Sequence, residues 1–193
     1  IDSTGSYGSY LAQWQGTGFT ITISYTMNGG SAGSHNTDIK ENITIQNTGA
    51  SALPFHFFQY SDFDLNDDSD DSGVVMPNGQ TVRQSDDGGP MGLSETTVTT
   101  PSRGVHGFYS DTLDALNDTT DGYVLSDTPG VGTLVGPGDL TWGFQWDRPI
   151  AAGDSFTITK DKKLTAAPIP EPGSFGILGF GMLALFARRR QRG

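Results

Sequence analysis

Residues 19–27 read FTITISYTM, and apolar and polar side chains alternate at every position of this stretch. Phe19, Ile21, Ile23, Tyr25 and Met27 occupy alternate positions, and threonine or serine lies between them. A β-strand places successive side chains on opposite faces, and β-branched residues favour extended backbone. The stretch therefore predicts a strand with one buried face and one polar face.

The same alternation recurs in residues 42–49 (NITIQNTG), 139–147 (DLTWGFQWD) and 153–161 (GDSFTITKD). The first of these ends in Asn47-Thr48-Gly49, which is typical of a turn. Together with residues 19–27, these stretches predict one common core. Its expected members are Phe19, Ile21, Ile23, Ile43, Ile45, Leu140, Trp142, Phe144, Trp146, Phe156 and Ile158.

Three other stretches predict further elements. Residues 54–65 (PFHFFQYSDFDL) begin with apolar residues on both faces, which indicates a central strand or a strand covered by a partner. Residues 74–84 (VVMPNGQTVRQ) predict a hairpin that turns at Pro77-Asn78-Gly79. Residues 110–118 (SDTLDALND) predict a short helix capped by Ser110.

Many short strands separated by Gly, Pro, Asn and Asp predict an all-β fold, an antiparallel β-sandwich of immunoglobulin-like or jelly-roll-like type. A closed barrel is the alternative that the pattern leaves open. The expected organisation is a flexible Gly/Ser/Tyr-rich leader (1–16), a β-sandwich domain (17–165), a Pro-rich linker (166–172), a hydrophobic membrane segment (173–187) and an Arg-rich end (188–193).

The chain is acidic, with a formal net charge of −11 over 193 residues. Without the four tail arginines and Glu171, 7 basic and 21 acidic residues remain, a net charge of −14. Such a surface repels nucleic acid, so we expect no nucleic-acid partner. The sequence contains no cysteine, which excludes disulfides and thiolate metal sites.

The C-terminal segment predicts membrane insertion. Residues 173–187 carry no charge and would form a helix of about 22 Å, shorter than the roughly 30 Å hydrocarbon core. Arg188, Arg189, Arg190 and Arg192 follow at once, a stop-transfer pattern whose long side chains can extend the span. Because positive charge marks the cytoplasmic side, the acidic body is expected outside. Ile1 is expected to follow a removed signal peptide.

Pro170-Glu171-Pro172, the apolar segment and the terminal arginine cluster together resemble the PEP-CTERM sorting signal. The resemblance implies an exported protein of a Gram-negative bacterium, held by its tail in the inner membrane. It also implies a partner, an exosortase-type enzyme that processes the chain near Pro170, Glu171 and Pro172, with the arginines as the stop-transfer signal. Such systems accompany exopolysaccharide and biofilm production, which points to the cell surface or the extracellular space.

Residues 61–73 (SDFDLNDDSDDSG) form the most acidic stretch. Asp62, Asp64, Asn66 and Asp68 stand at alternate positions, and this pattern resembles the start of a calcium-binding EF-hand loop. It departs from that loop where Asp67 replaces the glycine and Gly73 replaces the glutamate, so only weak calcium binding is expected. A solvated acidic loop is the alternative.

No catalytic motif stands out. The chain has no cysteine nucleophile, no Gly-x-Ser-x-Gly elbow and no phosphate-binding loop, and His35, His56 and His106 lack the spacing of a zinc site. We therefore expect no enzymatic activity, with a hydrolase as a remote alternative. The expected role is a structural protein of the surface or matrix that contacts exopolysaccharide or copies of itself. A carbohydrate-binding module is the second hypothesis, which exposed aromatic residues would favour; Trp14 in the leader is a candidate contact.

Overall fold

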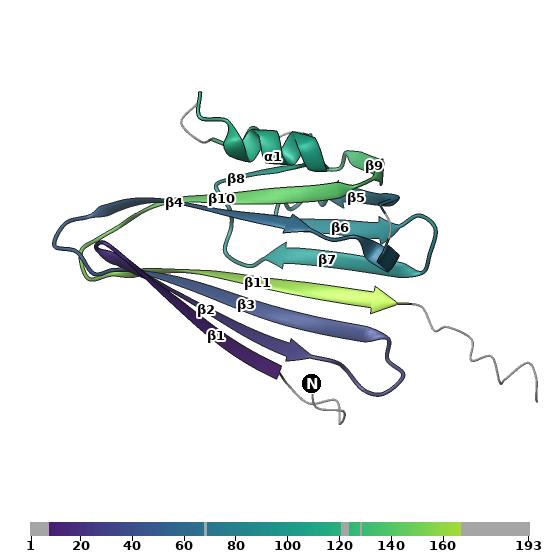
Figure 1. The fold of residues 1–193 in the computed structure, drawn as a ribbon, viewed down its shortest axis with the longest axis horizontal. Coiled ribbons are helices and arrows are strands. Elements are labelled where there is room, and N and C mark those ends of the chain that lie inside the picture. The colour runs from purple at the N-terminus through teal and green to yellow at the C-terminus, as the bar shows by residue number, and fades with distance from the viewer. Residues whose placement is uncertain (1–7, 68, 121–123, 128, 167–193) are drawn as a thin grey trace, which may run out of the picture.

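The computed structural model describes residues 8–67, 69–120, 124–127 and 129–166, and its strands form two antiparallel sheets (Figure 1). The larger sheet contains, in order across it, β1 (Gly8–Gly16), β2 (Phe19–Asn28), β3 (Asn36–Asn47), β11 (Ser155–Ala166), β7 (Met91–Thr97), β6 (Thr81–Asp86), β5 (Asp71–Val75) and β9 (Leu134–Gly138). The smaller sheet contains β4 (Leu53–Asp62), β10 (Leu140–Ile150) and β8 (Arg103–Phe108). A 3₁₀ turn, η1 (Leu65–Asp67), and one helix, α1 (Tyr109–Asn117), complete the described elements. The β-sandwich prediction is confirmed, and the two separate sheets are not a closed barrel.

The alternation in residues 19–27 forms β2, and its register shows which face is buried. Ile21 lies opposite Ile45 and Ile23 lies opposite Ile43 on β3. Opposite residues of an antiparallel pair share one face of the sheet. Because Ile43 and Ile45 are fully buried, this face is the one that packs against the smaller sheet.

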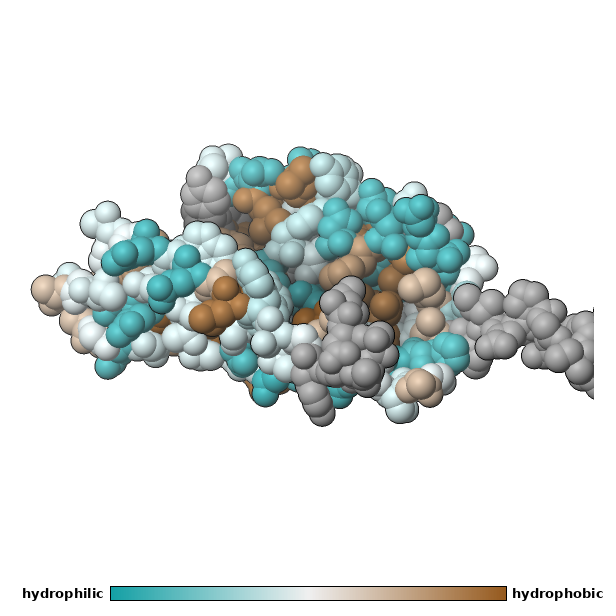
Figure 2. All heavy atoms as spheres, turned by 60° about the horizontal axis from the view of Figure 1, so that its bottom comes forward, coloured by the Kyte–Doolittle hydropathy of each residue, from teal (hydrophilic) through white to brown (hydrophobic). Residues whose placement is uncertain are grey.

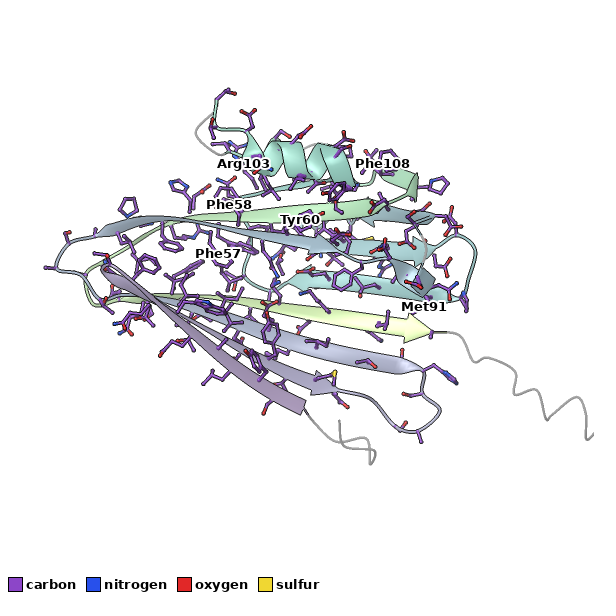
Figure 3. All side chains as sticks on the ribbon, viewed as in Figure 1. Phe57, Phe58, Tyr60, Met91, Arg103 and Phe108 are labelled. Carbon is purple, nitrogen blue, oxygen red and sulfur yellow. The ribbon has the colours of Figure 1, made fainter. Side chains whose placement is uncertain are left out.

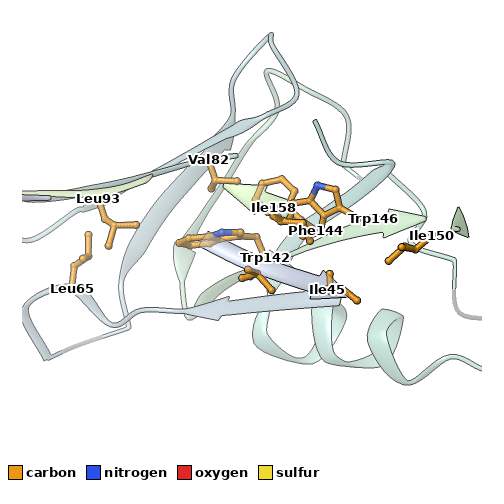
Figure 4. Packing of buried hydrophobic residues seen from close by; sticks show 10 residues of the cluster. Ile45, Leu65, Val82, Leu93, Trp142, Phe144, Trp146, Ile150 and Ile158 are labelled. Atoms are coloured by element: carbon orange, nitrogen blue, oxygen red, sulfur yellow. The ribbon is translucent and has the colours of Figure 1, made fainter. Parts of the chain in front are cut away.

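The hydrophobic core lies between the two sheets and is centred on β10 (Figure 4). Most of the predicted core is buried: Ile43, Ile45, Leu140, Trp142, Phe144, Trp146 and Ile158. The remaining four, Phe19, Ile21, Ile23 and Phe156, are only half-buried. The smaller sheet has three strands against eight, so it covers only part of the larger sheet, and β1 and β2 diverge from β4 toward the N-terminal end of β1 (Figure 1).

The stretch 54–65 forms β4, which is an edge strand of the smaller sheet and not a central one. Its apolar residues lie on both faces because each face of β4 is partly covered. Phe57 lies between the sheets and contacts Trp146, with ring centroids 6.3 Å apart (Figure 3). Phe58 lies on the opposite face and is half-buried there. Burial on both faces thus does not require neighbours on both edges.

Helix α1 and residues 124–127 cover the outer face of the smaller sheet. The Thr112 hydroxyl on α1 donates to the backbone carbonyl of Thr141, and the backbone N–H of Leu125 donates to Gln145 Oε1 at 2.8 Å. The helix is confirmed close to its predicted bounds. Ser110 is not its cap, however, because Phe108 occupies the N-cap position without a side-chain hydrogen bond.

The hairpin and the N-terminal segment test the predicted organisation of the chain. The hairpin of β5 and β6 is confirmed, with its turn closed by the N–H of Gly79 donating to the carbonyl of Met76. The leader is different from the prediction: Gly8–Gly16 is strand β1, paired with β2 along its whole length. Residues 167–193, which include most of the linker, the hydrophobic segment and the arginine cluster, lie outside the described part of the chain.

Candidate functional site

Three charged side chains meet inside the sandwich. Lys160 on β11 lies between Glu41 on β3 and Glu95 on β7, with its Nζ 2.7 Å from Glu41 Oε2 and 3.0 Å from Glu95 Oε1. Glu95 and Lys160 have no exposed surface, and Glu41 is 2% exposed. Lys162 Nζ is 3.3 Å from Glu41 Oε2 and adds a second cation. We call these four residues the buried ion network.

Neutral donors complete the network from both sheets. Glu95 Oε2 accepts from Ser61 Oγ at 2.7 Å and from Trp142 Nε1 at 3.0 Å, and both donors belong to the smaller sheet. Glu41 Oε1 accepts from the Tyr25 hydroxyl at 2.9 Å. Each carboxylate oxygen of the network therefore has a donor, which is the condition for burying charge without a large penalty.

The pKa values of the network follow from burial and pairing. Burial is the largest influence on Glu41 and opposes ionisation, but Lys160, Lys162 and the Tyr25 hydroxyl outweigh it and lower the pKa of Glu41 below 4.5. Burial also lowers the pKa of Lys160, against the attraction of Glu95. Burial first and then Glu41 raise the pKa of Tyr25 to about 12.

The buried ion network holds Lys160, Glu41 and Glu95 away from solvent. Its acid and base groups are paired with one another, and Lys160 and Glu95 have no surface that a substrate could reach. General acid–base catalysis requires a group within hydrogen-bond reach of a bound substrate. The sequence contained a signal for this network, because Glu41 is in phase with Ile43 and Ile45, and Lys160 is in phase with Ile158.

The acidic loop places its carboxylates in two groups. One carboxylate oxygen from each of Asp62, Asp64 and Asp139 lies within 4.8 Å of the other two, and all three residues are at the surface. Partial desolvation, and then repulsion from Asp62 and Asp64, raise the pKa of Asp139 above its ordinary value. We call these three residues the exposed acidic cluster. Asp139, which precedes β10, could not be associated with the loop from sequence spacing.

The other predicted calcium ligands have different positions. Asn66 lies in η1 with a left-handed backbone conformation (φ 62°), and Asp67 beside it has φ 64°. Asp67 thus adopts the conformation that favours glycine, at the position where an EF-hand loop has glycine. Asp68 lies outside the described residues. Calcium binding by Asp62, Asp64, Asn66 and Asp68 stays a prediction.

The second acidic group joins the end of the loop to β6. Asp70, Asp71 and Asp86 each have one carboxylate oxygen within 4.8 Å of the other two. Asp71 and Asp86 are buried, whereas Asp70 is exposed. We call these residues the strand-end cluster. Asp86 follows Asp71 by 15 positions in the chain, so only the pairing of β5 with β6 brings them together.

The histidines do not meet one another or a carboxylate cluster within the part of the chain that the structure describes. His106 borders a cavity of about 370 Å³ that is also lined by Val75, Val82 and Phe144. Its Nε2 lies 3.2 Å from the carbonyl of Thr133, and burial lowers the pKa of His106 more than this hydrogen bond raises it. His56 lies 2.7 Å from Asp147 at the surface. Neither arrangement supplies a nucleophile beside a base.

The aromatic residues divide into buried and exposed groups. Trp142 and Trp146 are each 1% exposed, as predicted for core residues. Tyr10 and Trp14 on β1 are 64% and 54% exposed. In register they oppose Tyr25 and Ile21, so they lie on the inner face of the larger sheet, beyond the cover of the smaller one. We call Tyr10 and Trp14 the edge aromatic pair. Figure 2 turns the bottom of Figure 1 forward, and the apolar side chains on this face are separated from one another by hydrophilic ones.

Comparison with solved structures places the fold among β-rich proteins. The chain is similar to the Slr1438 protein from Synechocystis sp. PCC 6803, with a TM-score of 0.50 and 8% sequence identity over 86% of this chain and 64% of that one. It thus spans less than two thirds of that protein's length. A putative aldose 1-epimerase from Escherichia coli K12 matches with a TM-score of 0.44 and 8% identity over 86% of this chain and 67% of that one. A putative kojibiose phosphorylase from the human microbiome matches with a TM-score of 0.43 and 9% identity over 84% of this chain and 18% of that one.

The C-terminal tail provides the comparison that bears on sorting. No curated protein matches the chain in sequence. Among the described residues there is no helix long and apolar enough to cross a membrane, and residues 173–187 lie outside them. The family model of the PEP-CTERM protein-sorting motif matches residues 168–191, which include Pro170-Glu171-Pro172 and the arginine cluster. The chain therefore carries a PEP-CTERM protein-sorting motif at residues 168–191, the signal of an exported protein.

Proposed function

We propose that this exported protein is a non-enzymatic structural component of the cell surface or extracellular matrix, associated with exopolysaccharide. The sorting motif at residues 168–191 carries the proposal, because it is the signal of an exported protein, which places the acidic body outside the cell. The interior supports a structural role, since Lys160 and Lys162 balance the charges of Glu41 and Glu95, and Lys160 and Glu95 have no exposed surface. Buried Trp142 and Trp146 support it as well, because they fill the core and cannot contact a glycan.

The tail is in this proposal a temporary anchor. Residues 173–187 hold the precursor in the inner membrane, Arg188, Arg189, Arg190 and Arg192 stop its export, and the linker presents Pro170-Glu171-Pro172 to the exosortase. Proline disfavours both helix and sheet pairing, and the linker contains three prolines, Pro168, Pro170 and Pro172. After processing, the body remains at the surface or joins the extracellular polymer.

The experiment measures the intact mass of the protein released by cells that contain an exosortase. The released chain should end near residue 170 and lack the arginine cluster. Replacing Pro170, Glu171 and Pro172 together by alanine should keep the protein in the membrane fraction. Ala167→Ser, in the same linker but outside the matched residues 168–191, is the matched control and should be released normally. Released protein that retains the complete tail would contradict the processing step.

A carbohydrate-binding module is the second candidate, and the edge aromatic pair favours it. Tyr10 and Trp14 are separated by three residues along one face of β1, and the rings of Tyr10 and Tyr25 lie 6.3 Å apart. Exposed aromatic rings give a binding site flat apolar surfaces, and the Tyr25 hydroxyl adds a polar group. This arrangement could stack against sugar rings at the open edge of the larger sheet.

Retention on the purified exopolysaccharide separates the two functions. A carbohydrate-binding module should lose most of its retention when Tyr10 and Trp14 are replaced by alanine. Leu11→Ala is the matched control, because Leu11 is 67% exposed on the same strand but opposes Ser24 on the outer face of the sheet. A purely structural association would be affected little by either change.

A further inference from the structure

Two carboxylates of the strand-end cluster face each other across paired strands. Asp71 begins β5, Asp86 ends β6, and the two residues are directly opposite in register. Like charges in this arrangement destabilise a sheet. Asp70 adds a third carboxylate, with one oxygen from each residue within 4.8 Å of the other two. Three negative charges are therefore concentrated at one end of the larger sheet.

Burial makes this concentration costly. Asp71 has no exposed surface, and Asp86 is 6% exposed. Asp71 Oδ2 accepts from the backbone N–H of Leu65 at 3.2 Å and from Gln84 Nε2 at 2.6 Å. These two donors hold the Asp71 carboxylate in place at the start of β5.

One carboxylate oxygen of Asp86 lacks a hydrogen-bond donor. Its Oδ1 accepts from the backbone N–H of Gly88 at 2.8 Å, whereas its Oδ2 is buried and has no hydrogen-bond donor. None of the ion pairs among the described residues includes Asp86. A buried carboxylate oxygen without a donor is a costly feature that requires an explanation. A bound cation would supply the missing partner.

The turn after β6 encloses the same carboxylates. A Cβ added to Gly89 would overlap Asp86 Oδ2, and one added to Gly88 would lie 3.2 Å from Asp70 Oδ2. The two glycines thus allow the backbone to approach the cluster more closely than other residues would. This close approach leaves room for Asp86, at the end of β6, beside Asp70, which precedes β5.

We propose that Asp70, Asp71 and Asp86 bind one calcium ion. The three side chains offer carboxylate oxygens, the ligands that calcium and magnesium prefer, whereas transition metals favour nitrogen or sulfur. Calcium accepts six to eight oxygen ligands in flexible geometry, whereas magnesium demands near-ideal octahedral geometry and gives up its water reluctantly, so carboxylates fixed by strand pairing suit calcium better. Water would complete the coordination. The site differs from the Asp62, Asp64, Asn66 and Asp68 set that the sequence predicts.

The ion would stabilise the sheet at a defined place. It would cancel the repulsion between Asp71 and Asp86 and attach the connection containing η1 to the end of β6. Because Asp71 also pairs with Gly138 on β9, three neighbouring strands would become more stable together. Calcium that binds only the folded state raises the melting temperature as its concentration rises above the Kd.

The test uses the full chain in non-ionic detergent, freed of metal by a chelator and titrated with calcium chloride in a calorimeter. We expect one equivalent of calcium to bind and the melting temperature to rise by several degrees at saturation. Asp86→Asn should weaken calcium binding at least about tenfold, because it removes one ligand charge. Without calcium, this variant should melt at the wild-type temperature or above it, because it also removes the repulsion.

Two further variants keep the test decisive. Asp70→Asn changes an exposed ligand, so it should fold normally and still weaken binding, which covers the case that Asp86→Asn does not fold. Asp38→Asn, which changes an exposed carboxylate of β3 outside both acidic clusters, is the matched control and should bind calcium like the wild type. The proposal is overturned if calcium neither binds nor raises the melting temperature, or if magnesium does so equally well. It is also overturned if Asp86→Asn and Asp70→Asn both bind calcium as tightly as the wild type and Asp38→Asn do.

Discussion

Lys160 and Glu95 form an ion pair in which neither side chain has any exposed surface, with Lys160 Nζ 3.0 Å from Glu95 Oε1. Both residues belong to the larger sheet, but Glu95 also accepts hydrogen bonds from Ser61 and Trp142 of the smaller sheet. The pair therefore links the two layers by polar contacts in the middle of the core. Such a link has directional requirements that apolar packing lacks, so it favours one relative position of the sheets.

Lys160→Met should destabilise the fold strongly. The change leaves Glu41 and Glu95 buried without their common cation, and removing one partner of a buried ion pair costs about 3–5 kcal/mol. Urea unfolding of the full chain measures the loss. Lys163→Met, at an exposed position of the same strand, is the matched control and should change stability by less than about 0.5 kcal/mol. Equal stability of the two variants would show that the network contributes little.

Acid should weaken the fold through Glu41. The pKa of Glu41 is lowered in the folded state, so its contribution to stability is complete above its ordinary value of 4.5 and is lost as the pH falls through the lower folded value. Urea midpoints measured between pH 7 and pH 3 should therefore decline below about pH 4.5. The decline should be smaller in Glu41→Gln. Asp38→Asn, which changes an exposed carboxylate of β3, should retain the decline of the wild type.

Trp142→Ala should cost about 3–5 kcal/mol of the free energy of unfolding, as expected for a large aromatic residue in a core. Trp142 is 1% exposed, stacks on Phe63 with ring centroids 5.7 Å apart, and donates its indole N–H to Glu95. Trp14→Ala provides the comparison. Because Trp14 is 54% exposed on β1, this substitution should lower the free energy of unfolding far less. If the two variants had similar unfolding midpoints, the assignment of Trp142 to the core would be wrong.

Periodicity in the sequence predicted the sandwich because apolar residues dominate the buried face of most strands. The charged residues of the buried ion network occupy the next alternate positions on the same strands. Glu41 continues the phase of Ile43, Glu95 continues that of Leu93, and Lys160 continues that of Ile158. Charged residues are normally exposed, so the prediction included only the apolar residues of each buried face and omitted the charged residues that continue it.

Other features depend on contacts between distant residues. Strand β1 has a Gly/Ser/Tyr-rich sequence with little hydrophobic alternation, and its extended conformation follows from pairing with β2. The strand-end cluster depends on the register that places Asp71 opposite Asp86. Local spacing identified the acidic loop as the place for carboxylates, but it could not show that Asp86 and Asp139 join them.

Asn47→Ala should cost about 2–4 kcal/mol, because Asn47 supports the turn after β3 with one buried and two part-buried hydrogen bonds. Its Nδ2 donates to the carbonyls of Ser51 and Ile150, both at 2.8 Å, and its Oδ1 accepts from the N–H of Gly49 at 2.9 Å. Alanine would leave the buried Ile150 carbonyl without this donor. Asn28→Ala is the matched control, since Asn28 Oδ1 accepts from the N–H of Gly30 in the same local pattern but at an exposed turn, and it should cost less than about 1 kcal/mol. Urea unfolding decides between them: equal losses in the two variants would mean that the turn, and not the buried carbonyl contacts, accounts for the effect.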